Sequence, residues 1–208
     1  MFYLVKTPWV VKKFLYPDYI WSIPSKEKKI YLSFDDGPHL TVTPFVLDQL
    51  NQYNAEATFF CIGKNVAEHP EIYKQIVNAG HSTGNHTYDH LNGWTVDDKT
   101  YLKNIIKAEK YIASSLFRPP YGKITRFQSK QLIDKLHYNI IMWSVLSGDF
   151  DTNLSPEDCW KNILKSTTPG SIIVFHDSEK AKKRMMYTLP ILLKYYKERG
   201  YSFERIII

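Results

Sequence analysis

The chain has 208 residues, and its 27 lysine and arginine residues against 21 aspartate and glutamate residues give a formal net charge of +6. Hydrophobic residues make up 44% and charged residues 23%, as in folded globular domains. This composition excludes a disordered tail, a collagen-like fibre and a coiled coil, and the length suits one domain. The basic excess is scattered in short runs, Lys26–Lys29 and Lys180–Arg184, which favours solvated surfaces over a nucleic-acid site.

The sequence predicts neither a disulfide framework nor a membrane span. Cys61 and Cys159 are the only cysteines, and both are expected to be free thiols. No run approaches the roughly 18 apolar residues that a membrane helix needs. Lysine and proline residues interrupt the aromatic N-terminus before a signal-peptide core can form, which predicts a cytoplasmic protein. Association with the cell envelope, through an export route without such a signal, is the alternative.

The chain divides into an N-terminal arm and one domain. Residues 1–28 carry three prolines among many aromatic side chains, and we interpret them as an irregular arm packed on a domain formed by residues 29–208. Within that domain, strand patterns alternate with helix patterns. In chain order the predicted elements begin with a strand at 30–34, a helix at 43–53, a strand at 57–62 and a helix ending at 79–80. A segment after Gly80 then leads into Asn85–His90, and a helix at 97–116 is followed by a strand that ends at Arg118. The remaining elements are a helix at 125–136, a strand at 139–143, a helix from 155, a strand at 171–175, a helix ending at 198–200 and a strand at 201–208.

Six or seven strand–helix units without strand pairs between them indicate parallel strands. The number of units suits a barrel slightly smaller than the common eight-fold one. We therefore predict an α/β fold, a distorted (β/α)7-type barrel of parallel strands in a single domain. A doubly wound open sheet is the alternative arrangement of the same elements.

Reactive side chains collect at one end of the predicted strands. In barrels of this kind the active site lies at the carboxyl ends of the strands. Five of these ends carry acids, histidines or an arginine, whereas the opposite ends carry almost none. The five segments are Asp35–Pro38, Asn85–His90, Arg118–Gly122, Gly148–Phe150 and His176–Asp177.

A metal site is one interpretation of these residues. His86 and His90 are four residues apart, so a helical turn or a tight loop can direct both imidazoles to one point. With one aspartate oxygen they would supply three protein ligands and leave an open position, as in catalytic zinc sites. An isolated pair of this spacing is more often a surface feature. However, the consecutive carboxylates Asp35 and Asp36 are costly to bury unless they bind a cation or divide roles.

Five short segments stand at these strand ends in a fixed order. They are Ser33–Gly37 (SFDDG), His86–His90 (HTYDH), Arg118–Gly122 (RPPYG), Leu146–Phe150 (LSGDF) and Val174–His176 (VFH). The set resembles the motifs of the polysaccharide deacetylases, the NodB-homology domains of carbohydrate esterase family 4. The resemblance extends over nearly the whole chain, from Lys29 to Tyr201.

The resemblance implies a metal-dependent hydrolase that removes N-acetyl groups from an acetylated amino-sugar glycan. Carried over residue by residue, it makes Asp36, His86 and His90 the ligands of one divalent metal ion. Zinc is favoured, although cobalt, nickel or manganese would also suit two histidines and an aspartate.

The same resemblance implies the catalytic roles. Asp35 would be the general base that accepts a proton from water, and His176 the general acid that protonates the leaving nitrogen. Arg118 would orient Asp35, and Asp149 would tune His176. The backbone N–H of Tyr121 would face the developing oxyanion.

Three positions depart from the family pattern. Leu146 stands where the family often has an acid, Phe150 replaces a tryptophan, and Val174 replaces a leucine. Phe150 and Val174 keep an apolar wall that could receive an acetyl methyl group. Trp94, in the loop after the histidines, is the candidate aromatic platform for a sugar ring.

The expected partner is an acetylated amino-sugar oligomer or polymer of the chitin or peptidoglycan type. We expect no nucleic acid, no membrane span and a monomer. Two alternatives stay open. The first is a metallohydrolase that acts on a small N- or O-acetylated molecule. The second is a glycan-binding member with weak catalysis, which the complete set of catalytic and metal positions disfavours.

Overall fold

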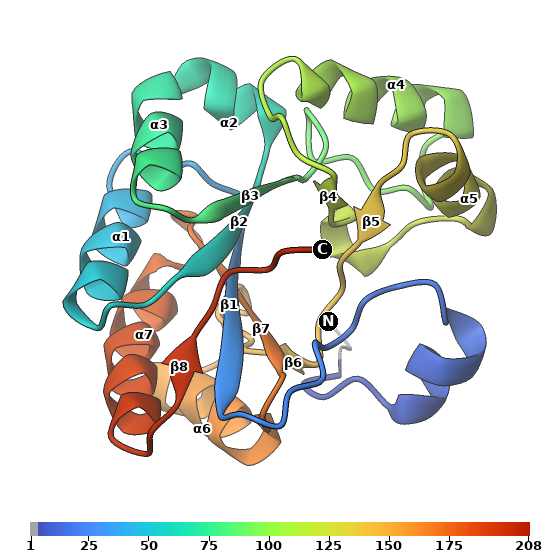
Figure 1. The fold of residues 1–208 in the computed structure, drawn as a ribbon. Coiled ribbons are helices and arrows are strands. Elements are labelled where there is room, and N and C mark those ends of the chain that lie inside the picture. The colour runs from blue at the N-terminus through green and yellow to red at the C-terminus, as the bar shows by residue number, and fades with distance from the viewer. Residues whose placement is uncertain (1–3) are drawn as a thin grey trace.

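Parallel strands form one curled sheet at the centre of the molecule (Figure 1). The computed structural model describes residues 4–208. The strands are β1 (Lys29–Asp35), β2 (Ala57–Cys61), β3 (Ser82–Asn85), β4 (Leu116–Phe117), β5 (Asn139–Ile140), β6 (Val145–Leu146), β7 (Ile172–His176) and β8 (Ser202–Phe203). Their order is β5-β4-β3-β2-β1-β7-β6, and β8 pairs with the start of β1. This arrangement confirms the predicted α/β fold with its distorted barrel, and the open doubly wound sheet is wrong.

Helices cover the outer face of the sheet (Figure 1). They are α1 (Val42–Gln52), α2 (Gly63–Glu68), α3 (Pro70–Asn78), α4 (Asp98–Glu109), α5 (Arg126–Asp134), α6 (Pro156–Ser166) and α7 (Lys182–Lys197). Side chains alternate along a strand, so Ile30, Leu32 and Phe34 of β1 pack into the main hydrophobic core. Ser33 and Asp35 lie on the opposite face, inside the barrel, where both contact an arginine from β4. The alternation of β1 therefore directs its carboxyl-terminal aspartate inward.

One predicted helix is too long. The apolar stripe at 97–116 continues past Glu109, but α4 ends there. The chain must turn to enter β4, and Ser114 stabilises that turn: its hydroxyl donates to the carbonyl of Thr83 at 2.6 Å and accepts the N–H of Leu116 at 3.0 Å. Tertiary hydrogen bonds thus override the helical periodicity.

Two other boundaries also differ. The helix expected to start at Thr43 begins at Val42, and the hydroxyl of Thr43 donates to the carboxylate of Asp177 instead of capping the helix. The last strand, predicted at 201–208, is limited to the two residues of β8, because most of that segment lies outside the ladder with β1.

The strand predicted at 139–143 is wrong in extent: β5 covers only its first two residues, and β6, a second short strand, lies beyond it. β5 pairs with β4, and β6 pairs with β7. Both belong to the continuous segment 139–146, so the sheet curls until its two edges meet in one stretch of chain. Since this segment contains no helix, the ring of helices has a gap between α5 and α6. The N-terminal arm occupies that sector (Figure 1).

Backbone hydrogen bonds attach the N-terminal arm to the closing segment, residues 139–146. The N–H of Leu146 donates to the carbonyl of Val5 at 2.8 Å, and the N–H of Met142 donates to the carbonyl of Ile20 at 2.8 Å. Unpaired backbone groups at a sheet edge are available to other chains, and covering the edge removes them. The arm therefore covers the point at which the barrel closes.

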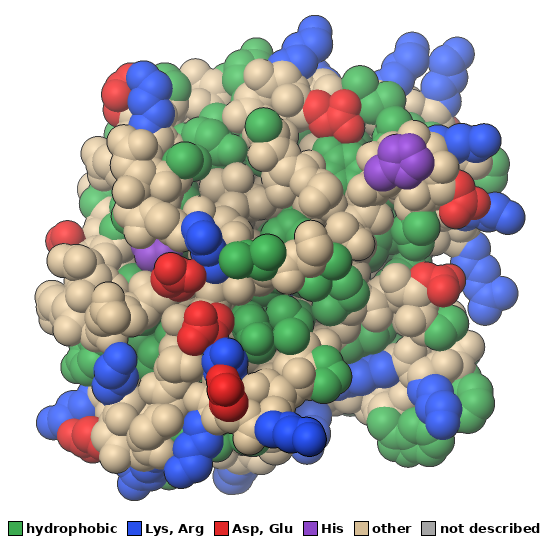
Figure 2. Space-filling model, viewed as in Figure 1, with side chains coloured by type: hydrophobic (Ala, Val, Ile, Leu, Met, Phe, Trp, Pro, Cys, Tyr) green, Lys and Arg blue, Asp and Glu red, His purple; other side chains and the backbone are tan. Residues whose placement is uncertain are grey.

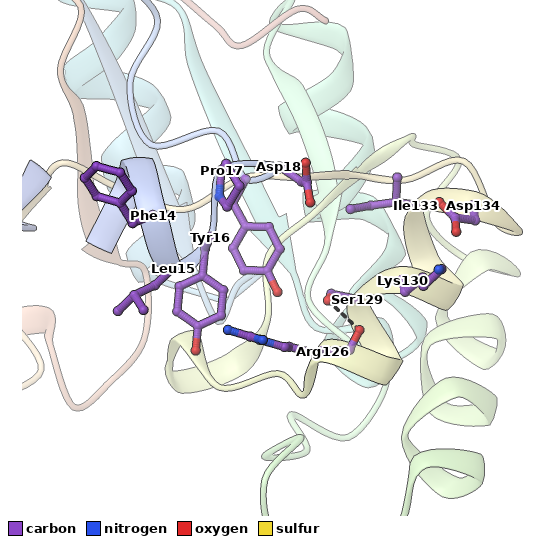
Figure 3. A pocket seen from close by; sticks show the side chains of 11 residues that line it. Phe14, Leu15, Tyr16, Pro17, Asp18, Arg126, Ser129, Lys130, Ile133 and Asp134 are labelled. Carbon is purple, nitrogen blue, oxygen red and sulfur yellow. Dashed lines mark hydrogen bonds between the residues drawn. The ribbon is translucent and has the colours of Figure 1, made fainter. Parts of the chain in front are cut away.

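A hollow of about 610 Å³ lies between the arm and α5 (Figure 3). Aromatic, aliphatic and oppositely charged side chains line it together. They are Phe14, Leu15, Tyr16, Pro17, Asp18, Tyr19, Arg126, Ser129, Lys130, Ile133 and Asp134. None of the site residues predicted from the sequence is among them.

The face seen in Figure 2 and the two cysteines agree with the sequence analysis. Lysine and arginine side chains are spread over the face seen in Figure 2 and do not form one large patch. Cys61 and Cys159 are buried free thiols, as predicted. Among residues 4–208, no helix is long and apolar enough to cross a membrane.

Gly84 on β3 is the position at which we expect the sheet to be least tolerant of added volume. A Cβ there would lie 2.4 Å from Cδ1 of the buried Phe60 ring. Overpacking a core costs about 1–3 kcal/mol. We therefore expect Gly84→Ala to lower the free energy of unfolding by about that amount in a urea titration. Ser82→Ala on the same strand is the control. Equal free energies of unfolding for the two variants would contradict the close packing of Gly84 against Phe60.

Candidate active site

Asp35 and Asp36 stand at the point where β1 ends, and the backbone turns sharply between them and the next element. Asp36 has a left-handed conformation (φ 80°), which aspartate tolerates better than most residues. The side-chain amide of Asn65 donates to the carbonyl of Asp36 at 2.7 Å, and the carboxylate of Asp177 accepts the N–H of Gly37 at 3.0 Å. The turn that presents both carboxylates is therefore held from two sides.

The two histidines lie in a tight loop after β3, not on a helix. The N–H of His86 donates to the carbonyl of Cys61 at 3.0 Å, which extends the pairing of β3 with β2 by one residue. His90 has a left-handed conformation (φ 56°), and this reversal brings its ring back beside the first histidine, with 5.1 Å between the ring centroids. Of the two geometries that the spacing allowed, the protein uses the loop.

Asp36, His86 and His90 form a group able to hold a metal ion. One ligand atom from each residue lies within 4.8 Å of the other two. Oδ1 of Asp36 is buried without a hydrogen-bond partner among the described residues, and it lies 3.7 Å and 3.2 Å from Nε2 of His86 and His90. Nδ1 of His86 is 2.7 Å from the carbonyl of Arg118, which leaves its Nε2 free for a metal. The residues present therefore fit a divalent ion with nitrogen and oxygen ligands.

The charges of these groups also suit a cation. Burial lowers the pKa of His86 to about 4 in spite of the nearby Asp35, so its imidazole is neutral at pH 7, as a metal ligand must be. Burial opposes the ionisation of Asp36, but His90, His176 and His86 outweigh it and lower the pKa of that carboxyl. The group thus offers neutral nitrogen and an ionised oxygen at neutral pH.

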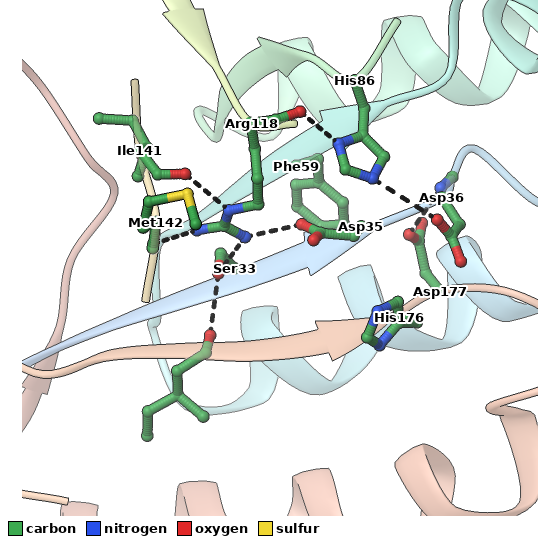
Figure 4. A network of polar contacts seen from close by, with 12 residues as sticks. Ser33, Asp35, Asp36, Phe59, His86, Arg118, Ile141, Met142, His176 and Asp177 are labelled. Carbon is green, nitrogen blue, oxygen red and sulfur yellow. Dashed lines mark hydrogen bonds and ion pairs between the residues drawn. The ribbon is translucent and has the colours of Figure 1, made fainter. Parts of the chain in front are cut away.

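Arg118, which has no exposed surface, holds Asp35 in place (Figure 4). Its Nη1 donates to Oδ1 of Asp35 at 2.7 Å and to the hydroxyl of Ser33 at 2.8 Å. Its Nε and Nη2 donate to the carbonyls of Ile141 and Met142 at 3.1 and 3.0 Å. Burial lowers the pKa of the guanidinium, and Asp35 opposes that effect. The expected Arg118–Asp35 contact is therefore present, and the arginine ties β1 to the segment that closes the barrel.

His176, at the end of β7, is paired with the buried Asp149. Nδ1 of the imidazole lies 2.8 Å from Oδ1 of Asp149, and the other carboxylate oxygen accepts the backbone N–H of His176 at 2.8 Å. Burial alone would lower the pKa of His176, but the carboxylate of Asp149 reverses this and raises it to about 9. The expected pairing is present, and the imidazole carries a proton at neutral pH.

These groups open into one pocket of about 390 Å³. Asp35, Asp36, His86, His90 and His176 line it, whereas Arg118 and Asp149 are fully buried behind it. The rest of the lining is mainly apolar, with a lysine and a serine at its edge. These residues are Pro119, Tyr121, Gly122, Trp143, Leu146, Phe150, Val174, Ser178 and Lys180.

The residues predicted to contact substrate line two adjoining spaces, the pocket described above and a neighbouring hollow. Phe150 and Val174 line the pocket, and the ring of Phe150 packs with its edge toward His176 at 5.2 Å. Tyr121 has a left-handed conformation (φ 61°), and its ring lies 4.6 Å from that of His90. Trp94 does not line this pocket but a neighbouring hollow. Its role as a sugar platform stays a prediction.

Sequence reasoning missed three supporting residues. Ser33 shares Nη1 of Arg118 with Asp35. Asp177 is buried and holds the turn at Gly37, where a Cβ would lie 2.1 Å from a carboxylate oxygen. Arg184 donates from Nε to the carbonyl of Asp149 at 2.6 Å. An acid directly after His176 at a buried strand end was a visible signal for Asp177, whereas the other two depend on contacts between distant segments.

At one mouth of the curled parallel sheet, a group able to hold a metal ion lies beside a fixed carboxylate and a charged imidazole. This combination is typical of metal-dependent hydrolases. The family model for polysaccharide deacetylases matches residues 22–141, more than half of the chain. The chain belongs to the polysaccharide deacetylase family, also called carbohydrate esterase family 4.

Relatives and solved structures agree with this assignment. Two peptidoglycan-N-acetylglucosamine deacetylases of Bacillus cereus are 39% identical over 166 residues and 35% identical over 192 residues. The first alignment covers 77% of this chain and 60% of that relative, and the second covers 89% and 90%. The crystal structure of the Bc1960 peptidoglycan N-acetylglucosamine deacetylase superposes with a TM-score of 0.87 at 35% identity, over 96% of this chain and 95% of that one.

Removing one histidine should empty the metal site. We expect purified wild type to retain about one divalent ion per chain and His86→Ala to retain almost none, because two remaining ligands hold an ion weakly. Elemental analysis after gel filtration measures this. His69→Ala, between α2 and α3, is the control and should keep the metal. Equal metal in His86→Ala and wild type would contradict the ligand assignment.

Proposed function

We propose that this protein hydrolyses the N-acetyl group of an acetylated amino-sugar glycan, releasing acetate and leaving a free amine on the sugar. The observation that carries the proposal is the meeting of three arrangements in one pocket: the triad of Asp36, His86 and His90, the Asp35–Arg118 pair and the His176–Asp149 pair. The names of the similar proteins support a peptidoglycan-type substrate rich in N-acetylglucosamine.

Asp36, His86 and His90 would hold the metal, for which zinc is the favoured ion. A divalent ion in such a site lowers the pKa of water and polarises a carbonyl group. Asp35 is the base: Arg118 binds its Oδ1, so Oδ2 is the oxygen available to accept the proton of the attacking water. Because three further hydrogen bonds fix Arg118, this carboxylate does not need to reorganise during the reaction.

His176 supplies the proton that the leaving nitrogen needs. An amide nitrogen leaves only after protonation, and the imidazole, with a pKa of about 9, carries a proton at neutral pH. When the carbon–nitrogen bond breaks, that proton moves to the sugar nitrogen and the electron pair of the bond stays there as the amine. The N–H of Tyr121 faces the developing oxyanion in this scheme.

The apolar wall of the pocket favours a substrate that carries an acetyl group. Leu146, Phe150 and Val174 line the pocket beside the acid, and a methyl group placed there would leave water. The substitution of Phe150 and Val174 for the family's tryptophan and leucine keeps this wall apolar. Leu146 lacks the carboxylate that the family often has at that position, and Asp149 is the acid that is hydrogen-bonded to the ring of His176.

Acetate release from a panel of substrates tests the proposal. The panel contains N-acetylglucosamine oligomers, peptidoglycan fragments, monomeric N-acetylglucosamine and an O-acetylated sugar. We expect release from the glycans, loss of it after chelation and recovery when zinc is restored. Asp35→Asn should keep the metal but lower kcat/KM by at least about 100-fold, because the bound water then has no base.

The alternatives give different results in the same assay. Release from monomers alone would favour a small-molecule hydrolase. Binding of oligomers without release, at full metal occupancy, would favour a glycan-binding protein. An Asp35→Asn variant as active as wild type would remove the base assignment.

The pH profile tests the acid. The negative charge of Asp149 stabilises the protonated form of His176, so replacing it by a neutral amide lowers the pKa of that imidazole. We expect Asp149→Asn to shift the basic limb of the kcat/KM profile to lower pH while the metal content is unchanged. Profiles are compared at full metal occupancy. An unmoved basic limb would mean that His176 is not the acid tuned by Asp149.

A further inference from the structure

The surface of the N-terminal arm carries exposed apolar side chains and lysines together. Residues 9–15 form a short helical segment, which the N–H of Tyr16 closes by donating to the carbonyl of Val11 at 3.1 Å. We define the arm patch as the apolar side chains Trp9, Val10, Phe14 and Leu15 and the lysines Lys12 and Lys13. Its apolar members are between 47% and 63% exposed. Figure 2 shows hydrophobic and basic side chains together in the region that the arm occupies in Figure 1.

The helical segment is packed against the domain through other side chains. Val11 and Tyr16 lie against a hydrophobic cluster whose members include Tyr101 and Ile105 of α4. Isolated apolar side chains are common on protein surfaces, but contiguous ones mark surfaces that bind a partner. Of the sixteen large hydrophobic side chains exposed within residues 4–208, four lie in these seven residues. The packing of Val11 and Tyr16 thus fixes the segment, while the arm patch remains exposed.

Aromatic rings and an ammonium group meet in the arm patch. The ring centroids of Trp9 and Phe14 are 5.5 Å apart, and Nζ of Lys13 lies 5.7 Å from the first and 5.9 Å from the second. A lysine can extend its charged end into a polar layer while its methylene groups stay beside apolar surface. The patch therefore offers apolar and cationic contacts at the same point of the protein surface.

The N-terminal arm is purely basic before Asp18. Residues 1–17 contain Lys6, Lys12 and Lys13 and no acidic residue, so they carry three of the six net positive charges. Among the described residues, none of these lysines forms an ion pair. Burial and the positive charge of Lys6 lower the pKa of Lys12. An anionic partner would therefore relieve a repulsion that the protein itself leaves uncompensated.

The chemistry of the arm patch selects the kind of partner. Tryptophan, phenylalanine and aliphatic side chains suit the boundary between the headgroups and the acyl chains of a bilayer, and lysines add attraction to anionic lipids. A second copy of this chain, bound through the same patch, would bring its own uncompensated lysines against these. Nucleic-acid bases stack on aromatic rings but leave Val10 and Leu15 without an apolar partner. The charge and the apolar surface together fit a lipid surface best.

We propose that the arm patch binds the surface of a bilayer that contains anionic lipids, with its apolar side chains among the upper acyl groups and its lysines beside the headgroup phosphates. The proposal goes beyond the reaction proposed above and does not depend on it. Binding would also orient the catalytic pocket, because the hydroxyl of Thr7 donates to the carbonyl of Trp143 at 3.0 Å and Trp143 lines that pocket. The arm thus connects the lipid surface to the site through a direct hydrogen bond.

Sedimentation with lipid vesicles tests the proposal. We expect the 208-residue chain to bind vesicles of phosphatidylcholine and phosphatidylglycerol in equal parts, and to bind pure phosphatidylcholine at least about tenfold more weakly. Trp9→Ala combined with Phe14→Ala should weaken binding to the mixed vesicles at least about tenfold, because the apolar contact is lost. Phe127→Ala is the control: this ring on α5 is 55% exposed but lies outside the patch, so the variant should bind as wild type does.

The lysines are tested by a separate pair of variants. Lys12→Gln combined with Lys13→Gln should weaken binding to the mixed vesicles about 25-fold, since each lysine at an anionic surface contributes about fivefold. Lys99→Gln combined with Lys103→Gln removes the same charge from exposed positions on α4 and should weaken binding less than about threefold. Equal losses in the two double variants would mean that only net charge matters and would overturn the patch.

Fluorescence quenching identifies the face of the protein that meets the bilayer. Brominated acyl chains quench a tryptophan only where it reaches the apolar layer, and the chain has five tryptophans. Wild type should be quenched by mixed vesicles made from brominated lipids. Trp9→Phe keeps an aromatic ring, so it should bind like wild type while it loses most of the quenching. Quenching that persists in the bound variant would place another face on the bilayer and overturn the proposal.

Other partners give distinct results. Wild type that sediments with neither kind of vesicle would overturn the proposal. A dimer in light scattering that Trp9→Ala dissociates, without vesicle binding, would assign the patch to a second copy. Binding of a single-stranded oligonucleotide that displaces the vesicles and is lost in the same variant would assign it to nucleic acid, and either assignment overturns the lipid surface. None of these measurements needs turnover, so a failure of the proposed reaction leaves them unaffected.

Discussion

The buried charge of Arg118 is the constraint on which the site depends. A guanidinium without access to solvent must have its donors satisfied, and removing one partner of such a pair costs about 3–5 kcal/mol. Here β1 supplies Asp35 and Ser33, and the closing segment supplies two carbonyl groups, while the side chain lies 4.0 Å from the Phe60 ring. Its own carbonyl fixes His86. One residue therefore links the closure of the barrel to the orientation of the proposed base and of a candidate metal ligand.

The second feature of the site is that two histidines in one pocket differ in charge: one imidazole is neutral and the other is protonated. Burial dominates at His86, which is neutral at pH 7, whereas Asp149 outweighs burial at His176, which is protonated. The difference arises from what each Nδ1 faces: a carbonyl for His86 and a carboxylate for His176. Neutral nitrogen suits a metal ligand and a charged imidazole suits an acid, so these partners separate the two roles within the 390 Å³ pocket.

Much of the fold and of the site could be predicted from the sequence, because the relevant signals are local. Alternating apolar residues marked β1 and predicted that Asp35 would follow it at the barrel mouth. Ser155 before Pro156 marked the start of α6, where its hydroxyl accepts the N–H of Asp158 at 3.1 Å. Parallel strands place their carboxyl ends on one side, so reactive residues distant in sequence could be assigned to a single site.

What the sequence by itself determined is therefore the class of fold, the residues at the mouth and the kind of chemistry that they suit. The tertiary structure alone decided that residues 139–146 serve both edges of the sheet, that the arm fills the gap left by a missing helix, and that Asp177 and Arg184 support the site. It also decided that Trp94 faces a groove beside the pocket and not the pocket itself. These features depend on pairing between segments far apart in the chain, which no local pattern of residue types encodes.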